Sequence, residues 1–312
     1  MYEPVKPVKI DIISGFLGAG KTTLISKLLQ EAYLGEKIAL LENEFGEIAI
    51  DGDILDHHGI TIKEIANGCI CCTLQGNFIN GIVELVQKNA PDRIIIEPTG
   101  LSHLRDIIFA CREAAKSVDI AINCIITVVD ATRFPMFMEV SGEFYRHQIG
   151  EGRTIVLSAV QNLEEEDNLD EIISGIRNLN PHAPIFTKPW DEMDGLELLQ
   201  VAEESGMMSH FPTDSHHHVH HRDHHRHGKE DYESFSLRMD KVWTDKEIKE
   251  LFHNLAEGIN GCVFRAKGFL PTEAGMVKVD YVYGRGKTEP SPYTGPGKIV
   301  IIGRDLAPQG LV

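Results

Sequence analysis

The chain lacks any hydrophobic run that could span a membrane, and it has fewer basic residues than acidic residues. No apolar stretch approaches the ~20 residues that a transmembrane helix needs. The 30 lysines and arginines stand against 47 aspartates and glutamates, which gives a formal net charge of −17. This balance argues against a nucleic acid or an anionic membrane as the main partner. The first residues have no basic start followed by an apolar run, so we expect no signal peptide and a cytoplasmic protein.

Cysteine is also scarce, and half of it is concentrated at one place. Three of the six cysteines lie within four residues, at Cys69, Cys71 and Cys72. Without a secretory signal, clustered thiols indicate metal binding or redox chemistry rather than a disulfide framework. Three thiolates this close can supply soft ligands to Zn²⁺, Cu(I) or Co²⁺. Inert buried thiols are the alternative, and a redox pair of the last two is favoured less.

The spacing of these cysteines leaves the fourth metal ligand open. The nearest candidates along the chain are two histidines and two glutamates, namely His57, His58, Glu42 and Glu44. An open fourth position suits a metal that must leave again. The other three cysteines fall in apolar or strand-like surroundings and are predicted to be core residues: Cys111, Cys124 and Cys262.

The most specific motif is a glycine-rich segment between a predicted strand and a predicted helix. Residues 15–22 read Gly-Phe-Leu-Gly-Ala-Gly-Lys-Thr and match the pattern G-x-x-x-x-G-K-[ST] at every fixed position. In this setting the backbone N–H groups surround a phosphate at a helix N-terminus. We therefore predict that the chain binds a nucleoside triphosphate. The predicted contacts are Gly15, Gly18, Ala19, Gly20, Lys21, Thr22 and Thr23.

Roles within the predicted site follow from the chemistry of phosphoryl transfer. Lys21 is expected to reach the β- and γ-phosphates, and the Thr22 hydroxyl to bind Mg²⁺. Glu97 ends a predicted buried strand, where a carboxylate can organise Mg²⁺ or water, and the N–H of Gly100 can sense the γ-phosphate. Glu42 follows another predicted strand at the same edge of the sheet, with a solvated turn as the alternative interpretation. Lys21, Glu97, Gly100 and Glu42 are thus the candidate catalytic residues.

Strand-like and helix-like segments alternate through the first two-thirds of the 312 residues. This alternation predicts a doubly wound, mostly parallel α/β domain with ligands at the carboxyl ends of its strands. We place this P-loop NTPase domain at residues 1–205. The predicted strands are 8–14, 37–41, 60–65, 92–97, 125–129, 154–157 and 185–186, and the predicted helices are 23–29, 73–88, 104–116 and 168–178.

A histidine-rich segment then interrupts the alternation. Its eight histidines lie within twelve residues: His216, His217, His218, His220, His221, His224, His225 and His227. Residues 206–230 are predicted to be a solvated linker, and neutral imidazoles suit Zn²⁺, Ni²⁺, Co²⁺ and Cu²⁺. Metal capture is favoured over a plain linker.

Beyond the linker, residues 231–312 are predicted to form a smaller α+β domain. The predicted helix is 244–257, and the predicted strands are 232–237, 262–267, 277–283 and 298–302.

Together these motifs resemble the CobW-type family of P-loop GTPases, relatives of the nucleotide-dependent metallochaperones for urease, hydrogenase and nitrile hydratase. The resemblance is carried by residues 15–22, 42–46, 68–72, 97–100 and 297–303. It implies GTP hydrolysis coupled to the binding of a transition metal, Zn or Co, and to its delivery to a client metalloprotein. It also implies that the clustered cysteines are metal ligands.

One departure from the family pattern concerns the nucleotide base. The family's guanine-reading Asn-Lys-x-Asp should follow the predicted strand 154–157, where this chain has Ser158-Ala159-Val160-Gln161. An aspartate would accept two hydrogen bonds from guanine, whereas Gln161 offers one carbonyl acceptor and a competing amide donor. Gln161 is therefore the expected base contact, with GTP and ATP both open as substrates.

Two other functions are compatible with the sequence. The first is metal buffering or storage with incidental NTPase activity, which the histidine-rich segment favours. The second is a P-loop kinase for a small molecule, against which the cysteine cluster and the lack of a lid-like basic segment argue. The oligomeric state stays open.

Overall fold

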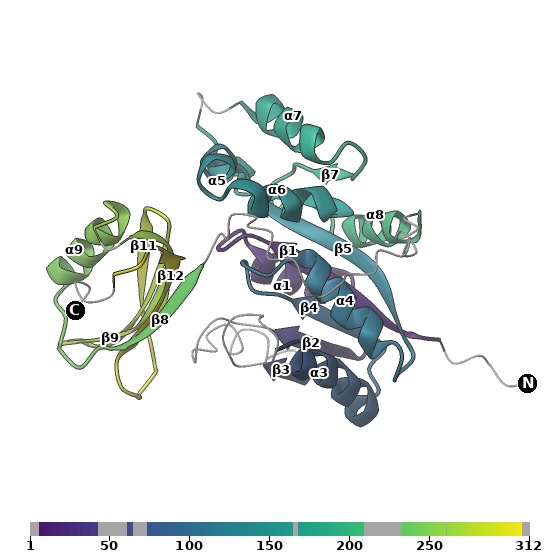
Figure 1. The fold of residues 1–312 in the computed structure, drawn as a ribbon, viewed down its shortest axis with the longest axis horizontal. Helices are drawn as coiled ribbons and strands as arrows, with labels where there is room; N and C mark the ends of the chain where they lie inside the picture. Colours follow the sequence, from purple (N-terminus) through teal and green to yellow (C-terminus); the bar gives the residue numbers. More distant parts are fainter. Residues whose placement is uncertain are drawn as a thin grey trace, which may run out of the picture. The chain divides into compact units, whose positions relative to one another are not determined.

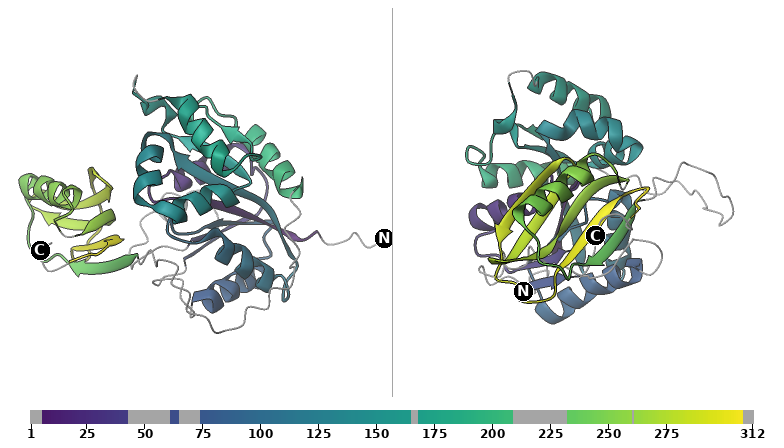
Figure 2. Two further views of the ribbon diagram at one scale, coloured as in Figure 1. Left: turned by 45° about the horizontal axis from the view of Figure 1, so that its top comes forward. Right: turned by 90° about the vertical axis from the view of Figure 1, so that its left-hand side faces the viewer.

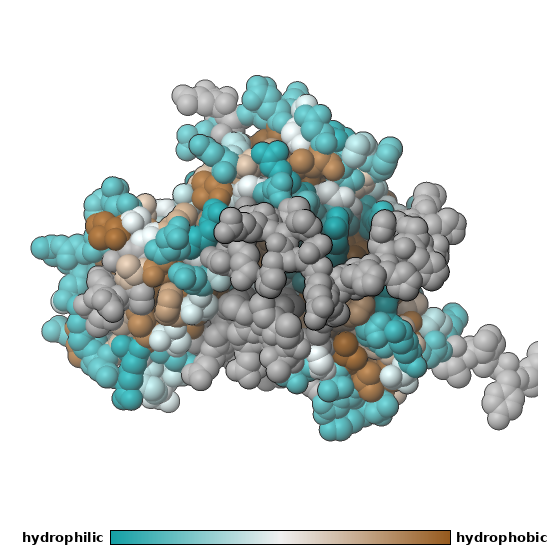
Figure 3. Space-filling view, in the orientation of Figure 1, coloured by the Kyte–Doolittle hydropathy of each residue, from teal (hydrophilic) through white to brown (hydrophobic). Residues whose placement is uncertain are grey.

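The computed structural model describes residues 6–42, 61–64, 74–164, 168–208, 232–259 and 261–307, which fall into two compact units (Figure 1). The secondary structure of the first runs from β1 to α8 and that of the second from β8 to β12. No helix in these described ranges is long and apolar enough to cross a membrane. Hydrophobic side chains form small separate patches among hydrophilic ones on the described surface in view (Figure 3). Hydrophobic residues scattered over the surface are normal for a folded protein.

The first unit is built around a parallel sheet of seven strands in the order β3-β2-β4-β1-β5-β6-β7. Its strands are β1 (Val8–Gly15), β2 (Ile38–Glu42), β3 (Thr61–Glu64), β4 (Arg93–Glu97), β5 (Ile120–Asp130), β6 (Thr154–Ser158) and β7 (Ile185–Phe186). Its helices are α1 (Lys21–Glu31), α3 (Leu74–Asn89), α4 (Leu104–Ala114), α5 (Phe134–Val140), α6 (Gly142–Glu151), α7 (Leu169–Leu179) and α8 (Gly195–Met208), with short 3₁₀ turns η2 (Ala131–Arg133) and η3 (Val160–Asn162).

Helices cover both faces of this sheet, as Figure 2 shows. Apolar residues of α1 and α8 share one core with the sheet, and those of α3 and α4 share a second core on the other face. The central strands are therefore buried on both sides, which explains their almost continuous apolar sequences, such as Arg93–Glu97. The predicted doubly wound α/β fold is confirmed.

The second unit is an antiparallel sheet of five strands in the order β11-β10-β9-β12-β8, packed against one helix. Its elements are β8 (Glu233–Arg238), α9 (Asp245–Ala256), β9 (Cys262–Thr272), β10 (Gly275–Val282), β11 (Arg285–Pro290) and β12 (Lys298–Arg304). A capping box begins α9, in which the side chains of Thr244 and Glu247 each accept a hydrogen bond from the other's backbone N–H. This smaller α+β unit agrees with the sequence-based expectation.

Several elements differ from the sequence-based prediction. β5 begins at Ile120 rather than at residue 125. Helices α5, α6 and α8 and strand β11 were not predicted at all. β11 is exposed along its whole length, so it has no hydrophobic alternation, and it forms by pairing with β10 across the turn at Gly284. In α6 the buried face contains the polar Gln148, which interrupts an apolar helical pattern.

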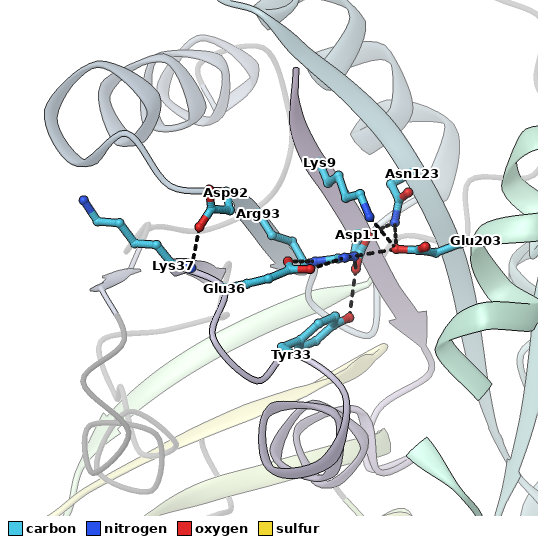
Figure 4. A network of polar contacts seen from close by, with 9 residues as sticks. All are labelled: Lys9, Asp11, Tyr33, Glu36, Lys37, Asp92, Arg93, Asn123 and Glu203. Carbon is cyan, nitrogen blue, oxygen red and sulfur yellow. Dashed lines mark hydrogen bonds and ion pairs between the residues drawn. The ribbon is translucent and has the colours of Figure 1, made fainter. Parts of the chain in front are cut away.

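A buried polar network connects the strands near their amino ends (Figure 4). Asp11 on β1 is fully buried and accepts hydrogen bonds from the Tyr33 hydroxyl at 2.8 Å and the Asn123 amide at 2.7 Å, together with an ion pair from Arg93. The Arg93 guanidinium also binds both carboxylate oxygens of Glu36, at 2.6 and 3.1 Å. Each charge in this network is thus paired and hydrogen-bonded, as burial requires.

We predict that Arg93→Met destabilises the first unit by about 3–5 kcal/mol, because it leaves the buried Asp11 carboxylate without its counter-charge. Urea unfolding followed by circular dichroism measures the change. The matched control is Arg105→Met, since Arg105 pairs with Glu151 with its side chain 76% exposed, and its loss should cost below about 1 kcal/mol. Equal effects of the two substitutions would contradict the importance of the network.

Candidate functional site

The glycine-rich loop joins the end of β1 to the start of α1. Gly15, Gly18 and Gly20 have φ values of +145°, +70° and +97°, in the region that favours glycine. A β-carbon on Gly15 would lie 2.4 Å from the carbonyl oxygen of Val128 on β5, so no side chain fits there. The loop therefore has a conformation that requires glycine at residue 15 and favours it at residues 18 and 20, and it ends at a helix N-terminus suited to an anion.

The side chain of Lys21 is 6% exposed and lies back across this loop. Its Nζ donates hydrogen bonds to the carbonyl oxygens of Gly15 and Phe16, at 3.2 and 3.3 Å. The ammonium group is thus held at the loop itself, where it can meet the phosphates of a bound nucleotide.

Thr22 and Glu97 are brought together although 75 residues separate them in the sequence. The Thr22 hydroxyl lies 3.1 and 3.2 Å from the two carboxylate oxygens of Glu97. Their contact follows from the pairing of β1 with β4, which ends at Glu97. A hydroxyl and a carboxylate at this spacing are oxygen ligands that fit Mg²⁺.

Glu42 lies beside this pair on the neighbouring strand. It is the register partner of Glu97 between β2 and β4, and it is 8% exposed. Two carboxylates thus end adjacent strands at the carboxyl edge of the sheet, as the sequence predicts for ligand-binding residues.

The turn after β4 packs directly on the glycine-rich loop. A β-carbon on Gly100 would lie 2.4 Å from the backbone nitrogen of Leu17. The buried Gln148 of α6 holds this turn by donating from Nε2 to the carbonyl oxygens of Gly100, at 3.0 Å, and Ser102, at 3.5 Å. Gln148 was missed from the sequence because α6 itself was not predicted.

Phe16 anchors the other side of the loop in an aromatic cluster. Its ring centroid lies 4.6 Å from Phe137, 6.2 Å from Phe144 and 5.6 Å from Tyr145. These rings come from α5 and α6, and Phe16 is 1% exposed. Helix α6 therefore contacts both the glycine-rich loop and the Gly100 turn.

The residues expected to read the base lie after β6. Ser158 donates from Oγ to the carbonyl oxygen of Ala19 at 2.6 Å, so its hydroxyl holds the glycine-rich loop. Ala159 has a φ of +56°, and Gln161 is exposed in η3. Thr23, the last predicted phosphate contact, is exposed in the first turn of α1.

The predicted transition-metal ligands lie outside the described residues. This applies to the cysteine cluster, to two histidines and a glutamate proposed beside it, and to the histidine-rich segment: Cys69, Cys71, Cys72, His57, His58, Glu44 and residues 216–227. In the described ranges no group of three or more histidine, cysteine, aspartate or glutamate residues is arranged to hold a metal ion.

The remaining cysteines behave largely as predicted. Cys111 and Cys124 are buried core residues, and Cys262 is half-buried on β9. Burial raises the pKa of Cys111 to about 12 and also raises the pKa of Cys124, so both are inert thiols rather than ligands.

Comparisons with known proteins agree with this geometry. The nucleotide-binding domain of the CobW/HypB/UreG family matches residues 9–187, and the C-terminal domain of the cobalamin synthesis protein cobW matches residues 232–312. The zinc chaperone YjiA of Escherichia coli (strain K12) is 31% identical over 281 residues, 85% of this chain and 82% of that protein.

A further relative is matched over a smaller share of its length, and a solved structure of YjiA covers nearly the whole chain. The zinc chaperone CobW of a Sinorhizobium species is 42% identical over 127 residues, which are 38% of this chain and only 36% of that relative. The crystal structure of Zn(II)-bound YjiA GTPase from E. coli is 21% identical, with 98% of this chain and 97% of that chain covered and a TM-score of 0.48. On the two domain matches, the chain belongs to the CobW/HypB/UreG family of P-loop GTPases and carries a cobW-type C-terminal domain.

Proposed function

We propose that the chain hydrolyses GTP and uses the cycle to bind zinc and deliver it to a client metalloprotein. The observation that carries the hydrolytic part is the contact of Thr22 with Glu97, at 3.1 and 3.2 Å, beside a glycine-rich loop packed against Gly100. Relatives named zinc chaperones support the choice of metal, including one matched over 85% of this chain. Cobalt is the second candidate, because thiolate and imidazole ligands suit both ions.

In this proposal the described residues position the triphosphate. Lys21 contacts the β- and γ-phosphates, and Thr22 with Glu97 holds Mg²⁺, which would neutralise charge on the phosphate oxygens. Gly100 offers its backbone N–H beside the γ-phosphate, and Glu42 lies next to Glu97. Loss of the γ-phosphate removes the contact at Gly100, which releases the turn after β4.

The order of the strands supports a link between this site and the cysteine cluster. Glu97, Glu42 and Glu64 are successive register partners across β4, β2 and β3. Adjacent strands lie about 4.8 Å apart, so the Cα atoms of Glu97 and Glu64 are roughly 10 Å apart. The segment with the cysteines begins directly after Glu64 and ends where α3 begins at Leu74. The metal segment is thus attached to the same edge of the sheet as the nucleotide site.

We predict that Thr22→Ala lowers Mg²⁺-dependent phosphate release about 100-fold, since it removes an oxygen ligand from the site where charge develops. Steady-state phosphate release at increasing Mg²⁺ concentration measures it. Ser26→Ala is the control with an unchanged rate, because Ser26 lies one turn further along α1 and its hydroxyl donates to the Thr22 carbonyl oxygen. An unchanged rate in Thr22→Ala would exclude the assigned Mg²⁺ site.

We also predict that Gly100→Ala slows hydrolysis about 100-fold, because the new β-carbon displaces the turn or the loop that it meets at Leu17. The affinity for a nucleoside diphosphate should change less than the hydrolysis rate, since a diphosphate needs no contact at this turn. Gly76→Ala on α3 is the matched control: nothing lies within 4 Å of its built β-carbon. Equal rates for the two variants would contradict a role for the Gly100 turn.

We predict that the cysteine cluster links zinc binding to hydrolysis. Zinc should change the hydrolysis rate of the wild-type protein, and a Cys69→Ala, Cys71→Ala, Cys72→Ala variant should lose this response while still binding nucleotide. Cys262→Ala, on β9 of the second unit, should keep the response. If zinc binds mainly through the histidine-rich segment and leaves hydrolysis unchanged in the wild type, the protein is a metal buffer with incidental NTPase activity.

A further inference from the structure

The nucleoside end of the site can be located from the phosphate end. In the proposed function Glu97 and Gly100 mark the Mg²⁺ and γ-phosphate end. Glu97 ends β4 and Gly100 follows it, and β4 lies on one side of β1. A triphosphate that begins there and runs along the glycine-rich loop directs its base to the other side of β1. On that side the sheet continues with β5, β6 and β7.

Two segments from that side meet the second half of the loop. Ser158, which ends β6, is bonded to the carbonyl oxygen of Ala19. Trp190 follows β7, and a β-carbon built on Gly20 would lie 3.4 Å from its Cζ2 and 3.6 Å from the Ser158 Cβ. The pairing of β6 with β7 places the two segments side by side. An indole ring thus lies at the edge of the loop on its nucleoside side.

The segment that carries Trp190 is held firmly in place. Its ring is half-buried against the core shared by α1 and α8, to which the 3%-exposed Met193 also belongs. The Pro189 carbonyl oxygen accepts hydrogen bonds from the backbone N–H groups of residues 192 and 193, both at 3.1 Å. Glu31 at the end of α1 accepts from the Gly195 N–H at 2.9 Å. A ring fixed in this way loses little entropy when a ligand stacks on it.

The polar side chains on the same side discriminate poorly between adenine and guanine. The Ser158 hydroxyl is 2.6 Å from Ala19 O and is used by the loop, and Ala159 has no polar side chain. Gln161 and Asn162 are exposed amides, each of which has both donors and an acceptor and can pair with either purine. Discrimination needs a buried polar group that the wrong base leaves unpaired, and none of these side chains provides one.

We propose that Trp190 is the main base contact and that it recognises the base by stacking. This inference rests on the proposed function. Every base has a π-face, so stacking accepts adenine and guanine alike. The substrate class is therefore purine nucleoside triphosphates in general, with GTP and ATP bound with similar affinity.

Calorimetry with non-hydrolysable GTP and ATP analogues tests this inference. The two dissociation constants should agree within about tenfold, and Trp190→Ala should weaken both by about 5- to 150-fold, the range for losing one aromatic–base stack. Trp190→Phe should retain most of the affinity. Inorganic tripolyphosphate, which has no base, should bind wild type and Trp190→Ala equally.

Fluorescence gives an independent readout because the chain has two tryptophans. In a Trp243→Phe variant only Trp190 emits, and both analogues should change its emission while tripolyphosphate should not. A GTP preference above about tenfold, or unchanged affinity in Trp190→Ala, would overturn base stacking and leave the proposed function intact. If the wild type binds neither the analogues nor tripolyphosphate, the proposed function fails and this inference fails with it.

Discussion

The site depends on backbone contacts that only glycine permits. Gly15 lies so close to Val128, and Gly100 so close to Leu17, that a β-carbon at either position would stand 2.4 Å from a backbone atom. These two contacts bring the glycine-rich loop, β5 and the turn after β4 together without intervening side chains. Thr22 and Glu97, which the pairing of β1 with β4 brings together, lie beside these close contacts. A larger residue at either glycine separates the parts that the proposed chemistry needs together.

The parallel sheet has a stabilising polar network near the amino ends of its strands and the candidate site at their carboxyl ends. Near the amino ends, Arg93 and Asp11 belong to a buried network that supports the pairing of β1 with β4. A slip of one residue would move every side chain of a strand to the other face of the sheet, so a fixed register is what aligns Glu42 with Glu97 at the carboxyl ends. Helix α6 adds a second constraint, since Gln148 and the aromatic rings around Phe16 hold both segments that would respond to a γ-phosphate.

Local rules predicted the parts of the fold that depend on local sequence. The phosphate loop, the buried strands and the Glu97–Gly100 turn were identified because their composition, order and spacing are characteristic. Features that depend on tertiary contacts were not predicted. Strand β11 forms through its pairing with β10. The positions of Gln148 and Trp190 depend on segments distant in the sequence. Gln161 as a base contact stays a prediction. The hydrogen bond of Ser158 to the loop carbonyl of Ala19 joins residues 139 positions apart, so local sequence rules could not predict it. The roles of the cysteines and histidines stay predictions, since they lie outside the described residues.

In the proposed function the nucleotide site and the metal segment are energetically linked. If nucleotide alters zinc affinity, zinc must alter nucleotide affinity by the same factor, and such couplings are typically 5- to 150-fold. The most direct measurement is the zinc dissociation constant of the wild-type protein with Mg²⁺–GDP and with a Mg²⁺-bound, non-hydrolysable GTP analogue, by competition with a chromogenic chelator. The proposed mechanism predicts constants that differ by at least about fivefold. Equal constants in the two nucleotide states would contradict it.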